Sequence, residues 1–116
     1  MTVIVENPGG QMTKKPETRL VKRIIAALEN EVGGYWVKIW GGGDYQRAGL
    51  PDIMGSCEGL FFGLEAKLPG GDYEPLQRHE AKEIKAKGKG IAACVHSPEE
   101  ALKVVRAALR RTKARR

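Results

Sequence analysis

The sequence predicts one α/β domain in which a mixed β-sheet is flanked by helices on both sides. Apolar residues recur at helical spacing in three segments, near residues 16–32, 74–87 and from 97 onward, as amphipathic helices require. Four short apolar runs, bounded by glycine or proline, have the composition of strands. The chain reads helix, three strands, helix, strand, helix, and its 116 residues suit a single hydrophobic core.

The first helix is predicted to begin near Pro16, since proline suits the first turn of a helix, and to end before Gly33. An apolar stripe over residues 20–28 forms its inward face. Glu17 lies one turn before this stripe and is therefore assigned to the same face. A carboxylate there either stabilises the helix dipole or points toward a catalytic site, and the residues alone favour the first interpretation.

Three strands should follow the first helix. The first covers residues 35–40, which are rich in strong β-formers. A glycine-rich loop leads to the second strand, which begins at Asp52, and the third runs over residues 60–64. The last two strands are close enough to form a hairpin with its turn at Glu58 and Gly59, where glycine tolerates a positive φ.

The register of this hairpin brings three charged side chains together. Asp52 stands six positions before the first turn residue and Glu65 six positions after the second, so the two carboxylates should face each other. Side chains alternate along a strand, which puts Lys67 on the face of Glu65 and turns Ala66 away. A shift of one residue in the pairing would send one carboxylate to the opposite face.

The second half of the chain continues with a helix, a strand and a helix. The helix over residues 74–87 ends at Gly88 and carries Gln77 on its inner face. Residues 91–95 form a short buried strand. The last helix begins at Ser97, in the S-x-x-E pattern of a capping box. Its inward face is predicted to consist of Leu102, Val105 and Leu109.

Two facing carboxylates and a lysine form a group that can hydrolyse a phosphodiester bond. Asp52 and Glu65 repel each other unless a cation lies beside them, and hard oxygen ligands suit Mg²⁺ or Mn²⁺. Such a cation lowers the pKa of a bound water, and Lys67 can orient that water or offset charge in the transition state. The alternative is an ordinary surface ion pair between Glu65 and Lys67. The buried strand that leads to Glu65 favours a functional site instead.

The net charge of +6 is concentrated at the C-terminus. Residues 101–116 contain seven basic side chains and no acidic ones, whereas residues 1–100 contain 13 basic and 14 acidic ones. We therefore divide the chain into a flexible N-terminal arm (1–12), one folded domain (13–110) and a basic C-terminal tail (111–116). A basic tail suits contact with a phosphate backbone, although a solvated terminus has the same composition. The candidate DNA contacts are Lys14, Lys15, Arg47, Arg110 and Arg111.

Other features of the sequence argue against several classes of protein. No stretch approaches the ~20 apolar residues of a membrane span, and the N-terminus lacks the layout of a signal peptide. Cys57 and Cys94 fit no metal-binding spacing and indicate free thiols in a reducing cytoplasm. The glycine-rich loop lacks the G-K-[ST] ending of a phosphate-binding P-loop.

The ordered motifs resemble those of the PD-(D/E)xK nuclease superfamily. The run 49–52 (Gly-Leu-Pro-Asp), the run 65–67 (Glu-Ala-Lys) and then Gln77 occur at the expected places in the element order. In this combination the sequence is similar to the VRR-NUC (virus-type replication-repair nuclease) family over roughly residues 17–109. The resemblance implies a restriction-endonuclease-like core with the element order αβββαβα.

The resemblance also implies an activity and a set of residue roles. The implied activity is that of a DNA endonuclease which depends on Mg²⁺ or Mn²⁺. By analogy Lys67 handles the nucleophilic water, and Gln77 positions that water or the lysine. The implied metal ligands are Asp52, Glu65, the Ala66 backbone carbonyl and, in a supporting role, Glu17.

Small free-standing members of this family resemble phage or bacterial proteins and lack accessory domains, so their specificity must have another source. Symmetric dimerisation is one such source, because two active sites about a two-fold axis can cut two strands. We therefore expect a cytoplasmic homodimer that acts on branched DNA such as four-way (Holliday) junctions. Two alternatives stay open: a sequence-specific restriction endonuclease, and a DNA-binding protein without catalytic activity.

Overall fold

The computed structural model describes residues 16–40 and 47–115. Its helices and strands follow the order αβββαβα, which confirms the predicted fold class. Lys14, Lys15 and the predicted arm (1–12) lie outside the described residues. The elements are α1 (Pro16–Glu31), β1 (Tyr35–Lys38), β2 (Ile53–Cys57), β3 (Leu60–Ala66), α2 (Pro75–Ala86), β4 (Ile91–Val95) and α3 (Pro98–Ala114).

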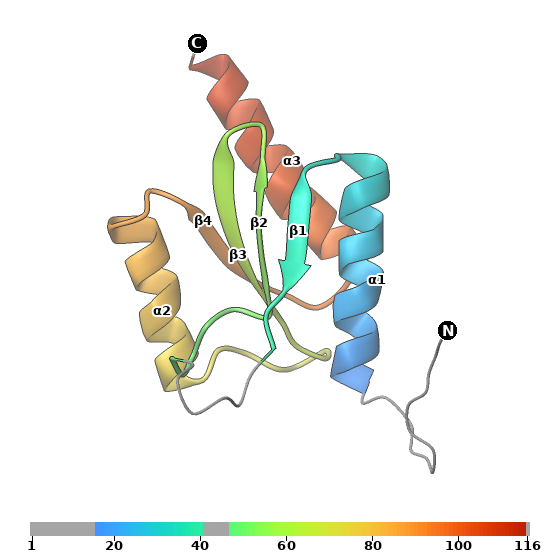
Figure 1. Ribbon diagram of the computed structural model, residues 1–116, viewed down its shortest axis with the longest axis vertical. Helices are drawn as coiled ribbons and strands as arrows, with labels where there is room; N and C mark the ends of the chain where they lie inside the picture. Colours follow the sequence, from blue (N-terminus) through green and yellow to red (C-terminus); the bar gives the residue numbers. More distant parts are fainter. Residues whose placement is uncertain (1–15, 41–46, 116) are drawn as a thin grey trace.

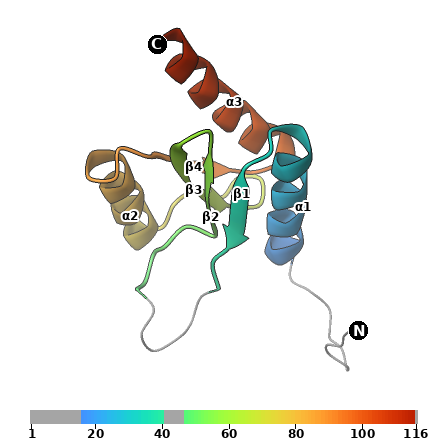
Figure 2. The ribbon, with the colours of Figure 1, turned by 45° about the horizontal axis from the view of Figure 1, so that its top comes forward.

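The four strands form one mixed sheet in the order β1-β2-β3-β4 (Figure 1). β1 pairs with β2 and β2 with β3 in antiparallel fashion, whereas β4 joins β3 in parallel. The parallel pairing needs a crossover, which α2 provides by carrying the chain from the end of β3 back to its start. Helices α1 and α3 pack together on one side of the sheet, and α2 lies on the other side beside β3 and β4 (Figures 1 and 2).

The main core lies between the sheet and helices α1 and α3. Phe62 and Leu64, which alternate along β3, point into it. The Trp36 ring from β1 packs against Phe62 with the ring centroids 5.4 Å apart. The apolar stripe of α1 over residues 20–28 is buried in the same core, as the helical spacing predicts.

Helix α3 meets this core through smaller side chains than predicted. Val105 is buried as expected, but the other central contacts come from Ala101 and Ala108, together with Pro98 at the start of the helix. Leu102 and Leu109 are only partly buried at the edges of the contact. Alanine allows α3 to lie close to its neighbours, and the leucines then fill the space on either side.

The basic residues up to Lys113 belong to α3. The helix runs to Ala114, so Arg111 and Lys113 lie on its last turn. The predicted boundary between residues 110 and 111 therefore has no counterpart in the secondary structure. Figure 1 shows this end of α3 beside the tip of the β2–β3 hairpin, at the opposite end of the molecule from the first turns of α1 and α2.

The β2–β3 hairpin has the predicted turn. Cys57 pairs with Leu60, which leaves Glu58 and Gly59 as a two-residue loop with φ angles of 50° and 85°. Positive φ at both positions is the type I′ geometry, whose twist matches that of the two strands. The ladder continues without interruption up to this turn, so both strands are longer than predicted, whereas β1 ends two residues early at Lys38.

A missing side chain at Gly63 allows α2 and the loop before β2 to approach the second face of the sheet. A Cβ at this position would lie 2.7 Å from Ile84 Cδ1 and 2.9 Å from Pro51 Cγ. Because side chains alternate along a strand, Glu65 and Lys67 point to the same side as Gly63. The face that α2 covers is therefore the face that carries the predicted catalytic residues.

A smaller prediction is also confirmed, since Cys57 and Cys94 are both free cysteines. Among the helices of the described residues, none combines the length and the apolar character that crossing a bilayer requires.

Candidate active site

The hairpin brings Asp52 and Glu65 together as the spacing predicts. Continued by one pair, the β2–β3 register places Asp52 directly opposite Glu65. The Ala66 N–H donates a hydrogen bond of 2.9 Å to Asp52 Oδ2. The Asp52 carbonyl oxygen accepts a second bond, of 2.7 Å, from the Ile39 N–H. Both the side chain and the main chain of Asp52 are thereby fixed by neighbouring strands.

Lys67 lies in the same group. Its Nζ is 3.9 Å from Glu65 Oε2, and its side chain is 13% exposed. The Lys67 N–H donates a bond of 3.0 Å to the Val95 carbonyl oxygen, so the backbone of the lysine is held by β4. The three groups that the sequence placed on one face are therefore close together in the structure. They lie where β3 ends, on the side of the molecule where α1 and α2 begin (Figure 1).

Glu65 is the buried acid of the site, with 3% of its surface exposed. Its Oε1 has no hydrogen-bond partner among the described residues. Burial, and then the neighbouring Asp52 carboxylate, raise the pKa of Glu65 to about 8, although the Lys67 ammonium acts in the opposite direction. The protein part of the site therefore favours the protonated form of this carboxyl group.

These donors fit a divalent cation. Among the described residues Glu65 Oε1 has no partner, and the single Lys67 ammonium nearby cannot neutralise both Glu65 and the facing Asp52 carboxylate. Hard cations such as Mg²⁺ and Mn²⁺ prefer oxygen ligands and keep coordination positions for water and phosphate. Asp52 and Glu65 can supply two such ligands, and the Ala66 carbonyl is the third that the sequence motif predicts.

The structure does not bring Glu17 into a cluster with the other acids. Its side chain is exposed on the first turn of α1, at the same end of the molecule as the carboxylate pair (Figure 1). Within residues 16–40 and 47–115, no group of three or more His, Cys, Asp or Glu side chains is placed to hold a metal ion. Asp52 and Glu65 thus stand as a pair, and the supporting role of Glu17 stays a prediction.

Gln77 caps the start of α2. Its Oε1 accepts a hydrogen bond of 2.8 Å from the Glu74 N–H, and the Glu74 side chain in turn accepts a bond from the Gln77 N–H, which completes a capping box. Glu74 Oε2 also lies 3.9 Å from Lys67 Nζ. Gln77 is therefore linked to Lys67 through Glu74. Sequence reasoning missed Glu74, although the E-x-x-Q pattern before an amphipathic helix was a usable signal.

A basic groove runs along the first turns of α2. Its volume is about 470 Å³, and Tyr73 lies in its lining. Burial, the Cys94 thiol and the Glu65 carboxylate raise the pKa of Tyr73 to about 12, so this phenol stays neutral and close to the site. The Arg78 guanidinium lies over the Tyr73 ring, 5.6 Å from its centroid. The residues that line the groove are Tyr73, Pro75, Arg78, His79 and Lys82.

The groove had no signal in the sequence, because Arg78 and Lys82 resemble any solvated face of a helix. Of the DNA contacts that were predicted, Arg47 donates a bond of 2.9 Å from Nε to Glu80 Oε2, while its side chain stays 64% exposed. This ion pair ties the loop before β2 to α2. Arg110 and Arg111 are exposed on α3, whose last turns lie far from the carboxylates (Figure 2).

In a comparison with solved structures, this fold is similar to a structure described as a VRR_NUC domain, with a TM-score of 0.63. The two chains share 24% sequence identity, and the match covers 78% of this chain and 94% of the other. No family model matches the sequence, and no curated protein matches it significantly. The predicted VRR-NUC fold is thereby confirmed.

Proposed function

We propose that this protein is a metal-dependent DNA endonuclease that hydrolyses phosphodiester bonds. The observation that carries this proposal is the buried Glu65 carboxylate, which faces Asp52 and lies 3.9 Å from the Lys67 ammonium. A protein that only binds DNA has no use for two facing carboxylates, because both repel the phosphate backbone. The VRR_NUC description of a structure with the same fold points to nuclease chemistry by analogy.

Each residue of the pair and the lysine has a role that its position supports. Asp52 and Glu65, with the Ala66 carbonyl, would hold Mg²⁺ or Mn²⁺. Such a cation, when bound, supplies Lewis acidity toward a phosphate oxygen and lowers the pKa of a coordinated water. Lys67 would orient the attacking water and offset the negative charge that develops on the phosphate oxygens.

The surroundings of Lys67 explain how its ammonium would keep its position. Glu65 and Glu74 lie on two sides of it, each with a carboxylate oxygen 3.9 Å from Nζ. The capping box with Gln77 fixes the main chain of Glu74. We therefore assign Gln77 an indirect role, in which it positions the lysine through Glu74.

DNA would approach the acidic pair along the basic groove of α2. Arg78 and Lys82 line this groove together with Tyr73, whose pKa the charge of Glu65 helps to raise. Cationic side chains there can bind the phosphates that flank the scissile bond, which offsets the repulsion between DNA and the carboxylates. The groove and not the C-terminal end of α3 is therefore the nearer source of phosphate contacts.

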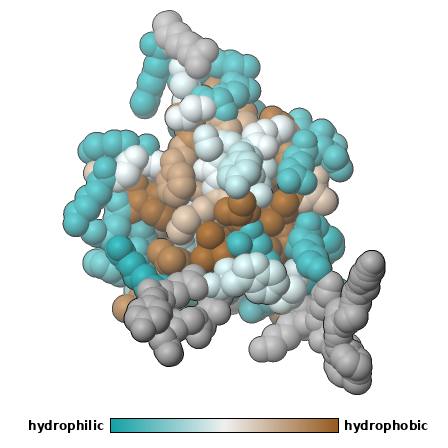
Figure 3. Space-filling view, viewed as in Figure 1, coloured by the Kyte–Doolittle hydropathy of each residue, from teal (hydrophilic) through white to brown (hydrophobic). Residues whose placement is uncertain are grey.

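The proposed substrate is branched DNA such as a four-way junction, and the proposed active form is a homodimer. One part of the sheet supports a second copy, because no helix of residues 16–40 and 47–115 covers the face of β1 and β2 next to the site. Hydrophobic side chains gather on this face (Figure 3), and exposed aromatic rings of Tyr35 and Phe61 border a shallow hollow over Val37 and Met54. A patch of this kind is typical of an interface.

Sedimentation of the wild type and of Phe61→Asp tests the proposed homodimer. A dimer that dissociates in the variant supports this interface, and a monomeric wild type contradicts it.

The first test of the nuclease is cleavage of a labelled four-way junction by the wild type and by Lys67→Ala. Each protein is incubated with Mg²⁺, with Mn²⁺ or with EDTA, and binding is measured in parallel by electrophoretic mobility. We expect metal-dependent cleavage by the wild type, and a loss of cleavage but not of binding in the variant. A flap and a linear duplex at equal concentration test the selectivity, since equal cleavage of all three would remove it.

The two alternatives give different results in the same assay. A sequence-specific restriction endonuclease would cut plasmid DNA into discrete fragments and would not prefer the junction. A DNA-binding protein without activity would leave every substrate intact, and Asp52→Ala would then change nothing in DNA integrity. Either result would contradict the role that we assign to the carboxylate pair.

A further inference from the structure

Exposed apolar side chains are unevenly distributed over the described residues. Five large hydrophobic side chains are strongly exposed, and two of them belong to the sheet face described above. The other three come from the segment after β1, the segment after β3 and the first turn of α2. These segments lie at the same end of the sheet as the carboxylate pair (Figure 1). We call these three residues the apolar rim: Trp40, Leu68 and Leu76.

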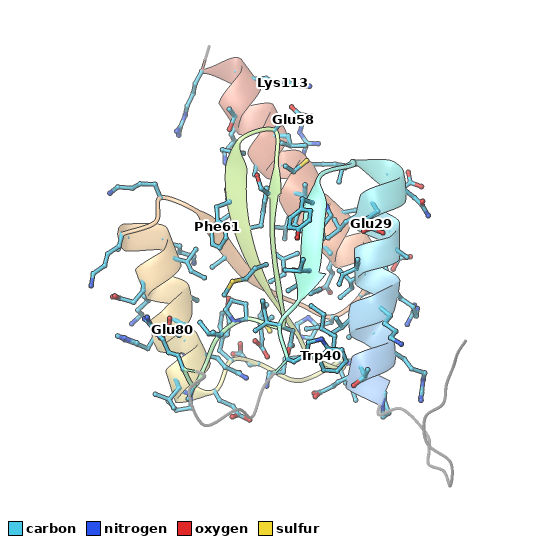
Figure 4. The ribbon with its side chains drawn as sticks, in the orientation of Figure 1. Glu29, Trp40, Glu58, Phe61, Glu80 and Lys113 are labelled. Atoms are coloured by element: carbon cyan, nitrogen blue, oxygen red, sulfur yellow. The ribbon has the colours of Figure 1, made fainter. Side chains whose placement is uncertain are left out.

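Two further observations place the apolar rim next to the candidate active site. Leu68 follows Lys67 directly in the chain, and the backbone of Leu76 lies against Gly49, three residues before Asp52. Figure 4 labels Trp40 at the same end of the molecule, below β1. An acidic, water-accessible site is thus bordered by hydrophobic surface, where solvated polar side chains are the usual composition.

Trp40 is the largest member of the rim, and its position is tied to the catalytic aspartate. It is 68% exposed. The preceding residue, Ile39, donates its N–H to the Asp52 carbonyl oxygen at 2.7 Å. The Lys38 ammonium lies 4.5 Å from the centroid of the Trp40 ring. A cation and an accessible aromatic ring therefore stand together, one hydrogen bond from the backbone of Asp52.

An aromatic ring beside a cation is the combination with which proteins bind single-stranded nucleic acid. The ring stacks on a nucleobase, and the cation contacts the adjacent phosphate. Bases inside a continuous duplex are already stacked on both faces and offer no free surface to such a ring. Bases at a junction, a flap or a gap do offer one, because they are unpaired or stacked on one face only.

We propose that Trp40 stacks on an unpaired nucleobase beside the scissile phosphate and thereby selects DNA that contains unpaired or unstacked nucleotides. This inference rests on the proposed nuclease function and names the substrate class of the same site. Lys38 contacts the phosphate of the stacked nucleotide. The leucines of the apolar rim border the base and exclude water from its edge. Stacking of Trp40 on an unpaired base therefore selects the DNA structure within one subunit, without recognition of a base sequence.

Binding in EDTA tests the inference without requiring cleavage. Full-length protein is titrated with three labelled probes of equal length: a continuous duplex, the same duplex with a three-nucleotide gap, and single-stranded oligothymidylate. We expect Trp40→Ala to weaken binding of the gapped and single-stranded probes by about 10- to 100-fold, the range for loss of one base–aromatic stack. Binding of the continuous duplex should change by no more than about twofold.

Matched variants separate stacking from a general structural effect. Trp40→Phe keeps a ring and should retain most of the affinity for the gapped probe. Asn30→Ala removes an exposed, uncharged side chain from the last turn of α1, and should leave all three affinities unchanged. Tryptophan fluorescence adds a direct readout, because Trp36 is buried while Trp40 is exposed. Quenching by oligothymidylate in the wild type should disappear in Trp40→Ala.

Two results would overturn the inference. If Trp40→Ala weakened the binding of all three probes equally, Trp40 would be a general DNA contact without selectivity. If the three affinities were unchanged in this variant, Trp40 would not belong to the binding surface. If Trp40→Ala does not fold, Trp40→Phe and the quenching of wild-type fluorescence carry the test. Cleavage of the same probes with Mg²⁺ reports separately on the nuclease. If the wild type cuts DNA but its tryptophan fluorescence is not quenched by the gapped or single-stranded probe, the proposed nuclease function stands and the role of Trp40 is refuted.

Discussion

Replacement of Glu65 by glutamine should stabilise the metal-free protein at alkaline pH. The carboxyl group is 3% exposed, and its pKa is raised to about 8 from an ordinary value of 4.5. A raised pKa means that the fold favours the protonated acid. The contribution of Glu65 to stability is therefore complete below pH 4.5, declines between pH 4.5 and about 8, and is lost above that. Glutamine resembles the protonated acid in shape and cannot ionise.

The magnitude follows from the size of the shift. One pKa unit corresponds to about 1.4 kcal/mol, so the full shift sets an upper bound of about 5 kcal/mol. Water reaches the site from the side of Asp52 and Lys67, which are not fully buried, and the effective dielectric is correspondingly high. We therefore expect a difference of about 2 kcal/mol at pH 9. In a domain of this size, that corresponds to a rise of about 6–10 °C in the melting temperature.

Urea denaturation in EDTA at pH 5, 7 and 9, followed by circular dichroism, measures this difference. Glu65→Gln should be close to the wild type at pH 5 and more stable at pH 9. Glu29→Gln, which removes an exposed glutamate from α1, is the control and should show no such divergence. A variant that is less stable than the wild type at pH 9 would refute the argument from burial.

Addition of a metal should reverse the order of stability of the wild type and Glu65→Gln. A cation that binds only the native state stabilises it by about 2.7 kcal/mol at a hundredfold excess over its Kd. We expect Mg²⁺ or Mn²⁺ to stabilise the wild type in this way and to have little effect on Glu65→Gln. Ligands must be deprotonated to bind, so the apparent affinity of the wild type should increase as the pH rises toward 8. Equal stabilisation of both proteins would exclude Glu65 as a ligand.

Three further predictions concern the salt dependence, the packing and the pH dependence of the protein. In the double variant Arg78→Ala/Lys82→Ala, the slope of log Kd for DNA against log[salt] should become shallower by about 1.8, the value for two lost phosphate contacts. The same measurement on Arg110→Ala/Arg111→Ala tests the contacts predicted on α3. Gly55→Ala would press a Cβ against the Tyr35 carbonyl oxygen and the Trp36 ring. This variant should therefore lower the free energy of unfolding, measured by urea denaturation, by about 1–3 kcal/mol. Ser56→Ala, at the exposed neighbouring residue, should have little effect. Hydrogen bonds to the Gly71 carbonyl (2.7 Å) and the Glu100 carboxylate (2.9 Å) raise the pKa of His96 above 6.5. The stability that these bonds contribute is therefore present below pH 6.5 and is lost as the pH rises through the raised pKa. His96→Gln should remove this part of the pH dependence of the urea midpoint.

The position of the carboxylate pair could be predicted from the sequence because its geometry is local. Asp52 and Glu65 are equally distant from a two-residue turn, and in an antiparallel hairpin that spacing alone decides which residues face each other. The turn is itself readable, since Gly59 supports the positive φ that a type I′ hairpin needs. Lys67 then follows from the alternation of side chains along β3. No contact between distant segments enters this argument.

The rest of the site could not be predicted because it depends on contacts between distant segments. Arg47 resembles a free DNA-contacting side chain in a loop, yet it pairs with Glu80, which is 33 residues away. Trp40 resembles the end of a buried strand, yet β1 ends at Lys38 and leaves the ring exposed. In α3 the leucines were predicted to be central, whereas close approach of the helix places Ala101 and Ala108 there. In each case the neighbour across the fold decided the outcome.

Glu65 shows why the function and the stability of this domain oppose each other. The strand that carries it is buried on one face by α1 and α3 and on the other by α2, so the carboxyl group loses the water that would stabilise its charge. Partial compensation comes from Lys67, while the adjacent Asp52 raises the pKa further. A cation that binds here gains the negative potential that Lys67 leaves uncompensated, reduced below pH 8 by the cost of deprotonating Glu65. The same burial that destabilises the metal-free protein therefore strengthens the binding on which the proposed activity depends.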